Sequence, residues 1–239
     1  MDKKISLSVL VPFLNEEDCI FDSVNRLIDT NLFKEIILID NGSTDQSRIK
    51  VNDLVENFKN IKLIEAFEEK GKGYCVQKGI NYISSTHVIV HDADLEYFPD
   101  DINAMFSYIY EHPNELILGS RTIGDKKRNN KYFHTKLFNQ FFSLFFSILN
   151  FYKVSDISSC YQINSLKKLR KMKLKENGFA LEVEILSKNL KMNYKIIEVP
   201  INYEGRTYEE GKKIKIKDAI SIFFKIMAYS KLNFLSDRF

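Results

Sequence analysis

The sequence contains few of the residues that mark several protein classes. Its 239 residues include no tryptophan, three cysteines, four prolines and nine glycines. So little glycine and proline excludes a collagen-like or low-complexity chain, and a hydrophobic fraction of 44% excludes intrinsic disorder. Cys19, Cys75 and Cys160 are odd in number and form no CxxC pair, so neither a disulfide framework nor a zinc site is supported. We therefore expect a reducing, cytoplasmic environment.

Several catalytic and membrane signatures are also absent. No GxGxxG follows the first predicted strand and no GxxxxGK[ST] occurs, which argues against a dehydrogenase and a P-loop NTPase. The absence of GxSxG and HExxH gives no support for a serine hydrolase or a zinc protease. No apolar run reaches the roughly 18 to 20 residues of a membrane-spanning helix. The apolar run at residues 5–11 is too short for a signal peptide.

The net charge of +3 conceals a polarised chain. Residues 1–120 carry 11 basic and 21 acidic side chains, whereas residues 121–239 carry 24 basic and 11 acidic ones. The basic side chains do not follow one helix or groove, so we expect no nucleic-acid partner. An excess of positive charge in the second half instead suits anionic ligands or an anionic membrane surface.

Apolar, β-branched runs alternate with amphipathic runs in the first half. This alternation predicts a mainly parallel sheet with helices on both faces, and ligands then bind beyond the carboxyl ends of its strands. The predicted strands are 6–11, 35–39, 61–66, 88–91 and 116–118. The predicted helices are 16–30, 45–58, 73–84 and 101–111, capped by Asn15, by Ser43 or Thr44, and by Asp100.

The second half is richer in phenylalanine. It predicts strands at 161–164 and 195–199, a helix at 180–191, and amphipathic helices near 132–152 and 216–232. Residues 137–152 include six phenylalanines and follow a lysine-rich stretch. Such a segment is either a core helix or a helix at a membrane interface, where the preceding lysines would lie beside anionic headgroups.

Acidic residues follow the fourth predicted strand. Asp92 and Asp94, separated by Ala93, can present two hard oxygen ligands to Mg²⁺ or Mn²⁺. An acidic turn that leads into the next helix explains the tripeptide equally well. Glu96 is a further ligand or, with more support, a residue that orients the ligands.

Two other strand ends carry weaker signals. Asp40 ends a buried strand, where its carboxylate can bind a base or ribose or can close a turn. Gly71-Lys72-Gly73 opens a helix and offers close backbone approach and a positive charge to a phosphate, although such a sequence is also common in plain turns.

Taken in order, these segments resemble glycosyltransferase family 2. The resemblance rests on VPFLNE (11–16), EIILIDNGSTD (35–45), GKG (71–73), DADLE (92–96) and GSR (119–121). It continues through Asp156 and residues 182–186, 198–203 and 206–213, where it is closest to the dolichyl-phosphate mannose synthase-like branch. It implies an α/β GT-A fold with a Rossmann-like sheet, in a single domain spanning residues 1–239. Residues 1–120 would bind the nucleotide-sugar, and residues 121–239 the acceptor.

The resemblance also implies roles for individual residues. The nucleotide-sugar would contact Pro12, Asn15, Glu16, Asp40, Asn41, Gly71, Lys72, Asp92 and Ala93. A Mg²⁺ or Mn²⁺ ion would be held by Asp92, Asp94 and Glu96. Asp94, Arg121 and Arg206 would be catalytic, and Arg128 and Lys213 would face the acceptor phosphate. The chain departs from the family pattern at Leu14, Asn41 and Lys212.

The implied reaction is displacement at the anomeric carbon with inversion. The donor would be of the GDP-mannose or UDP-glucose type, and the acceptor a polyprenyl or dolichyl phosphate, whose anionic oxygen needs no strong base. A glycan or glycolipid hydroxyl is the alternative acceptor; it needs a base, for which Asp156 and Glu182 are candidates. A non-catalytic nucleotide-binding module also remains open. We expect peripheral attachment at the inner face of the cytoplasmic membrane.

Overall fold

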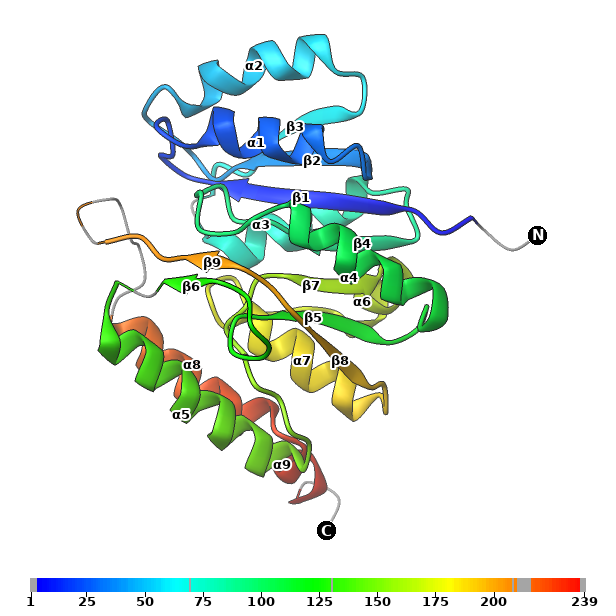
Figure 1. Cartoon of the computed structure of the whole chain (residues 1–239), viewed down its shortest axis with the longest axis vertical. Helices are drawn as coiled ribbons and strands as arrows, with labels where there is room; N and C mark the ends of the chain where they lie inside the picture. Colours follow the sequence, from blue (N-terminus) through cyan, green and yellow to red (C-terminus); the bar gives the residue numbers. More distant parts are fainter. Residues whose placement is uncertain (1–3, 69, 130, 208, 210–215, 237–239) are drawn as a thin grey trace.

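A computed structural model of the chain describes residues 4–68, 70–129, 131–207, 209 and 216–236 (Figure 1). Its main sheet has seven strands in the order β3-β2-β1-β4-β7-β5-β8. The strands are β1 (Leu7–Phe13), β2 (Phe33–Asp40), β3 (Ile61–Glu65), β4 (His87–Val90), β5 (Leu116–Ser120), β7 (Gln162–Ser165) and β8 (Ile196–Pro200). β7 is antiparallel to β4 and β5, and the other neighbours in this sheet are parallel. The predicted mainly parallel sheet is confirmed.

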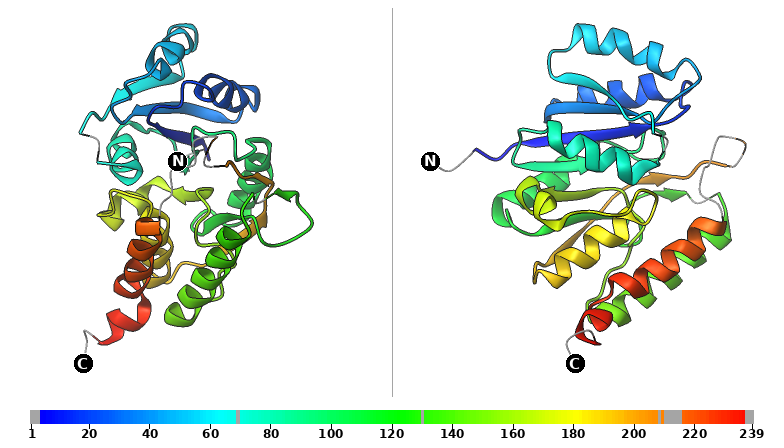
Figure 2. Two further views of the ribbon diagram at one scale, coloured as in Figure 1. Left: turned by 90° about the vertical axis from the view of Figure 1, so that its left-hand side faces the viewer. Right: turned by 180° about the vertical axis from the view of Figure 1, so that it is seen from behind.

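Helices cover both faces of the sheet, as the two rotated views show (Figure 2). The helices are α1 (Ile20–Asp29), α2 (Ser47–Asn57), α3 (Lys72–Gly79), α4 (Asp100–Glu111), α5 (Phe133–Asn150), α6 (Leu166–Met172), α7 (Leu181–Lys191), α8 (Ile216–Tyr229) and α9 (Lys231–Ser236), with a short 3₁₀ turn η1 (Ile80–Tyr82). Alternate residues of β1 enter different cores: Val9 packs with α1, α2 and α4, and Leu10 packs with α3, α6 and α7. This period of two fixes the register, since a one-residue slip would exchange the two cores.

The predicted helix caps are wrong. The residues before α1, α2 and α4 are Cys19, Gln46 and Pro99, and none of these makes a side-chain capping bond. Asn15 instead has φ 51° and accepts a hydrogen bond from the Thr44 amide at 2.8 Å. Its side chain therefore joins two loops, and the first helix begins five residues later than Asn15.

The structure also contains elements that the sequence pattern did not predict. Besides α6 and α9, a two-stranded parallel ribbon forms from β6 (Arg128–Asn129) and β9 (Tyr203–Glu204). A bridge between Tyr97 and Tyr203 connects this ribbon to the loop after β4. The ribbon therefore brings the start of the second half against the site end of the main sheet (Figure 1).

The Phe-rich helix α5 and helix α8 lie side by side at one end of the molecule (Figures 1 and 2). Phe145 of α5 stacks on Phe223 of α8, with ring centroids 4.9 Å apart. The inward side of α5 is buried in the core through Phe142 and Phe146. Its outward side and that of α8 expose Leu137, Phe138, Phe141, Leu144, Ile148, Ile220, Phe224 and Met227, which we name the α5–α8 apolar face. Within the described residues, no helix is both long and apolar enough to cross a membrane.

Candidate active site

The loops after β1 and β2 are joined by side-chain bonds at the carboxyl edge of the sheet. The Asn15 amide donates to the Ser43 hydroxyl at 3.1 Å, and the Glu16 amide donates to the Ser47 hydroxyl at 2.8 Å. Pro12 lies within β1, buried beside Ile39 of β2. These bonds fix the backbone from which the Glu16 side chain reaches Arg206, the residue that also contacts Asp94.

Asp40 ends β2 as predicted, and its two oxygens differ. Oδ1 accepts hydrogen bonds from the Gly42 and Ser43 amides at 3.2 and 2.8 Å, which is the turn that the sequence allowed. Within the part of the chain that the structure describes, Oδ2 is buried without a hydrogen-bond partner, 3.9 Å from Nη1 of Arg48. The neighbouring Asn41 Oδ1 is also buried and unpartnered. Unsatisfied buried acceptors are costly, so these two atoms suit a ligand that supplies N–H or O–H donors.

The glycines around Lys72 permit close approach of another chain segment. Gly71 has φ 100°, and a Cβ there would lie 2.8 Å from the Asn177 carbonyl oxygen. A Cβ at Gly73 would overlap the Glu176 carbonyl oxygen. The segment that needs these glycines is thus residues 176–177, and Lys72 begins α3 directly against it.

Lys72 lies between two carboxylates. Its Nζ is 2.6 Å from Asp92 Oδ1 and 2.7 Å from Glu182 Oε1, and its side chain is 11% exposed. Burial lowers the pKa of Lys72, but Asp92 and Glu182 outweigh burial and raise it well above its ordinary value. Burial likewise opposes ionisation of Asp92, and Lys72 nevertheless lowers its pKa. Sequence reasoning considered Glu182 only as a base and missed its pairing with Lys72, which lies 110 positions away.

Arg206 connects the second aspartate to the loop after β1. Its Nη2 is 3.0 Å from Asp94 Oδ2, and its Nη1 is 3.0 Å from Glu16 Oε2. Burial, together with the carboxylates of Glu96 and Asp92, raises the pKa of Asp94 to about 8, and Arg206 offsets only part of this shift. The loop after β4 therefore concentrates more negative charge than its neighbours neutralise.

Glu96 holds the ribbon that carries Arg206. Its Oε1 accepts a hydrogen bond from the Arg206 amide at 2.6 Å, and its Oε2 accepts one from the Tyr203 hydroxyl at 2.7 Å. Both of its oxygens are thus engaged with β9 and the residues that follow it. These contacts position the ribbon, and the predicted role of Glu96 beside a metal ion, as a ligand or as an orienting residue, stays a prediction.

The donor set suits a hard divalent cation. Carboxylate oxygens and a surplus of negative charge are what Mg²⁺ and Mn²⁺ select. Here four carboxylates share the two cationic side chains Lys72 and Arg206, namely Glu16, Asp92, Asp94 and Glu182, and Glu96 lies against the Arg206 backbone amide. Within the part of the chain that the structure describes, however, no three His, Cys, Asp or Glu side chains are arranged to hold a metal ion. In the structure, Asp92 is paired with Lys72 and Asp94 with Arg206.

Arg121 is buried against Asp156. Its Nε and Nη2 donate to the two Asp156 oxygens at 2.7 and 2.8 Å, and its amide donates to Oδ2 at 3.0 Å. Its guanidinium also stacks over Tyr203, 4.8 Å from the ring centroid. Arg121 therefore contacts both strands of the ribbon, through Tyr203 and Arg128, and both Asp156 oxygens accept hydrogen bonds from it.

Arg128, on the ribbon strand β6, has donors without acceptors. Its Nη1 donates to the Arg121 carbonyl oxygen at 3.3 Å, whereas Nε and Nη2 are buried with no hydrogen-bond partner among the described residues. Burial and the nearby Arg121 lower the pKa of Arg128. A buried guanidinium with two unused donors is suited to bind an anion. Lys213, the other residue expected at the acceptor phosphate, lies outside the described residues, as does Lys212.

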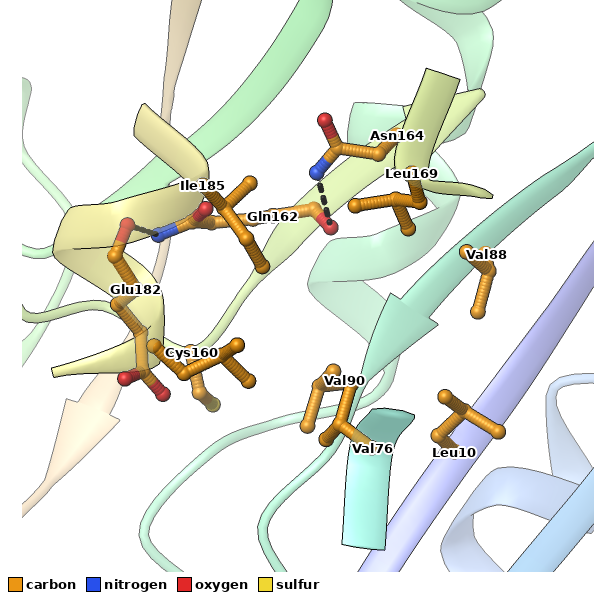
Figure 3. Close-up of a pocket in the computed structure, with 11 residues that line it drawn as sticks. Leu10, Val76, Val88, Val90, Cys160, Gln162, Asn164, Leu169, Glu182 and Ile185 are labelled. Carbon is orange, nitrogen blue, oxygen red and sulfur yellow. Dashed lines mark hydrogen bonds between the residues drawn. The ribbon is translucent and has the colours of Figure 1, made fainter. Parts of the chain in front are cut away.

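A small cavity of about 10 Å³ is lined by Glu182 and Cys160, among other residues (Figure 3). Gln162 crosses it and donates to the Glu182 carbonyl oxygen at 3.4 Å, and its own Oε1 is unpartnered. The space is about that of one water molecule, so it is not a substrate pocket.

Residues 8–173 match the family described as Glycosyl transferase family 2. The chain belongs to this family. The sequence-based assignment to a glycosyltransferase enzyme and to this family is thus confirmed. A dolichol-phosphate mannosyltransferase of Pyrococcus furiosus is 27% identical over 87% of the chain, which spans 59% of that relative. A UDP-N-acetylglucosamine–dolichyl-phosphate N-acetylglucosaminyltransferase of Methanococcus voltae is 28% identical over 95% of the chain and 96% of the relative.

The fold agrees with solved structures. Glucosyl-3-phosphoglycerate synthase of Mycobacterium tuberculosis, in complex with Mn²⁺, UDP and glucosyl-3-phosphoglycerate, superposes with a TM-score of 0.72. The match covers 95% of this chain and 80% of the synthase at 17% identity. The GT-A fold expected from the sequence is confirmed.

Proposed function

We propose that this family 2 glycosyltransferase transfers a sugar, with inversion, from a nucleotide-sugar to a polyprenyl or dolichyl phosphate, in a reaction that needs Mg²⁺ or Mn²⁺. The observation that carries the proposal is the Arg128 guanidinium, whose Nε and Nη2 are buried and unpartnered beside Arg121. A cation that is desolvated in this way is stabilised by an anionic acceptor, and a neutral hydroxyl would give it no counter-charge.

The donor would lie over the carboxyl edge of the sheet. Asp40 and Asn41 supply unpartnered acceptors for base or ribose donors, with Pro12 and Asn15 shaping the same edge. Asp92 and Asp94 would hold the divalent cation, which when bound would neutralise the charge that develops on the nucleoside diphosphate. Arg206 and Lys72 add positive charge around that leaving group. The Mycobacterium synthase was solved with Mn²⁺ and UDP, which supports this arrangement.

The alternative hydroxyl acceptor would need a general base. The two candidates from the sequence are engaged elsewhere: Asp156 accepts three hydrogen bonds from Arg121, and Glu182 is paired with Lys72. A phosphate acceptor is already ionised and needs neither. The dolichyl-phosphate transferases among the relatives favour the same acceptor class.

The acceptor's lipid tail requires an apolar environment, which the α5–α8 apolar face provides. Large side chains such as Phe138, Phe141 and Leu144 are more than half exposed there, and the exposed Lys136 stands at one end. Full burial of such a side chain contributes roughly 1.5 to 3 kcal/mol, so each of these half-exposed ones would contribute roughly half of that when it leaves water. We therefore place this face on the inner surface of the cytoplasmic membrane, with residues 1–120 forming the donor half and 121–239 the acceptor half of one domain.

The acceptor assignment is tested by incubating the protein with Mn²⁺, a radiolabelled nucleotide-sugar, and either polyprenyl phosphate or a membrane glycolipid. A sugar linked through phosphate is released by mild acid, whereas an ordinary glycoside resists the same treatment. We expect an acid-labile lipid product with polyprenyl phosphate. An acid-stable product formed only with the glycolipid would establish the alternative.

A further inference from the structure

Lys72 and Arg206 make the same kind of contact at the two ends of Asp92-Ala93-Asp94. Lys72 bridges Asp92 and Glu182 at 2.6 and 2.7 Å, and Arg206 bridges Asp94 and Glu16 at 3.0 and 3.0 Å. Each cation thus has one inner carboxylate, on the loop after β4, and one outer carboxylate on a different element. The inner pair is the pair assigned above to the divalent cation.

We propose that Glu182 is a positioning residue that retains Lys72 when a divalent cation takes over Asp92. Lys72 is then an internal counter-ion: it neutralises Asp92 before the metal binds and stays beside the site, on Glu182, afterwards. The inference rests on the proposed metal dependence, and it adds a role for a residue that neither the motif nor the reaction scheme assigns.

The packing around Lys72 makes this retention possible. Gly71 and Gly73 seat the start of α3 against residues 176–177, and the Glu176 carbonyl oxygen also accepts a hydrogen bond from Gln77 at 3.0 Å. The same segment is tied to α7, because Glu184 accepts hydrogen bonds from the Lys175 and Glu176 amides. Lys72 and Glu182 therefore belong to one connected unit, which consists of α3, α7 and residues 175–177.

Asp92 comes from a different unit, the loop after β4. If its carboxylate turns to a metal ion, Lys72 loses one of its two carboxylate partners while its side chain remains almost enclosed, at 11% exposed. An unpaired buried ammonium is strongly unfavourable, and Glu182 removes that penalty. Without Glu182, metal binding would leave the Lys72 ammonium buried and unpaired, and the free-energy cost of that state would weaken the metal affinity.

A double-mutant cycle measured with Mn²⁺ alone tests this role without any turnover. Free Mn²⁺ is followed by electron paramagnetic resonance in the full-length wild type, Glu182→Gln, Lys72→Met and the double variant. We expect Glu182→Gln to weaken Mn²⁺ binding about tenfold, the scale of one charged hydrogen bond, and Lys72→Met to strengthen it. In the Lys72→Met background, Glu182→Gln should change the Mn²⁺ affinity less than about twofold, because this background has no ammonium that metal binding could leave unpaired.

The possible outcomes separate the inference from the function on which it rests. An equal effect of Glu182→Gln in both backgrounds would overturn the retention role, since it would show only a through-space charge effect on the metal. No Mn²⁺ binding by the wild type would overturn the metal site itself, and the retention role with it. Glu111→Gln, the same chemical change at an exposed position on α4, should leave the affinity unchanged. A repeat of the cycle with Lys72→Gln, together with circular dichroism of every variant, separates these effects from misfolding.

Discussion

Replacing Arg128 with glutamine should damage acceptor use and leave donor binding intact. The guanidinium lies on the ribbon strand β6, where Nη1 is satisfied by the Arg121 carbonyl oxygen and Nε and Nη2 are unpartnered. Adjacent donors of one guanidinium can bind two oxygens of a phosphate at once. The substitution removes both of them and the positive charge, whereas no hydrogen bond or ion pair within the described residues joins Arg128 to the donor residues on β2 and the loop after β4.

The size of the effect follows from those two donors. A hydrogen bond to a charged group contributes about 1.5 to 3 kcal/mol, so losing two costs roughly 3 to 6 kcal/mol as an upper range. Because water and a neutral glutamine restore part of this, we expect about a 100- to 1,000-fold fall in kcat/KM for polyprenyl phosphate. The stability of the fold should not fall, since burial and the nearby Arg121 disfavour the charged form of Arg128 more than the Asp156 carboxylate favours it.

The assay is lipid-linked sugar formation over a range of polyprenyl phosphate concentrations, with nucleotide affinity measured by calorimetry. Arg26→Gln, at an exposed arginine of α1, is the matched control and should behave as the wild type. An Arg128→Gln variant with unchanged kcat/KM for the acceptor would refute the anion-site reasoning. Equal losses in nucleotide affinity and acceptor use would refute the division of the site into donor and acceptor sides.

Three further predictions concern other parts of the molecule. All three cysteines lie within the described residues, and only Cys19 is partly exposed. Cys19 should therefore react fastest with a thiol reagent. Because Cys19 lies beside Glu16, binding of Mn²⁺ and a nucleoside diphosphate should slow that reaction. Phe141→Asp should reduce sedimentation with anionic vesicles, whereas Phe21→Asp, at an exposed phenylalanine of α1, should not. Burial raises the pKa of Glu35, but hydrogen bonds from Ser8 and Ser84 outweigh burial and lower the pKa overall. The contribution of Glu35 to the free energy of unfolding is therefore complete above its ordinary pKa and is lost as pH falls through the lowered value. The difference in urea midpoint between wild type and Glu35→Gln should therefore shrink from pH 7 to pH 3, and a constant difference would contradict this.

The sequence predicted the sheet well because burial on both faces leaves a clear pattern. Strands such as Leu7–Phe13 are buried at every position, and the amphipathic helices between them have one apolar stripe. The pattern could not give the antiparallel direction of β7, which depends on its neighbours, nor a ribbon of two-residue strands. The cap at Asn15 was wrong because its side chain bonds to a loop 29 residues away.

The site was predicted as a set of residues more readily than as a set of contacts. Strand ends identified Asp40, Asp92 and Asp94 because parallel strands finish at one edge. Their partners come from distant elements, as with Lys72 and Glu182, or with Arg121 and its buried Asp156. Such pairings depend on tertiary packing, so a local motif cannot reveal which of several charged residues will meet.

The most direct test is sugar transfer to polyprenyl phosphate from a panel of UDP-, GDP- and dTDP-sugars, with Mn²⁺ or with EDTA. The lipid product is identified by mass and its anomeric configuration by nuclear magnetic resonance. We predict transfer from at least one donor with inverted configuration, abolished by EDTA and by Asp94→Asn while circular dichroism is unchanged. Full transfer by Asp94→Asn or in EDTA, or a retained anomeric configuration, would contradict the proposed metal-dependent inverting reaction.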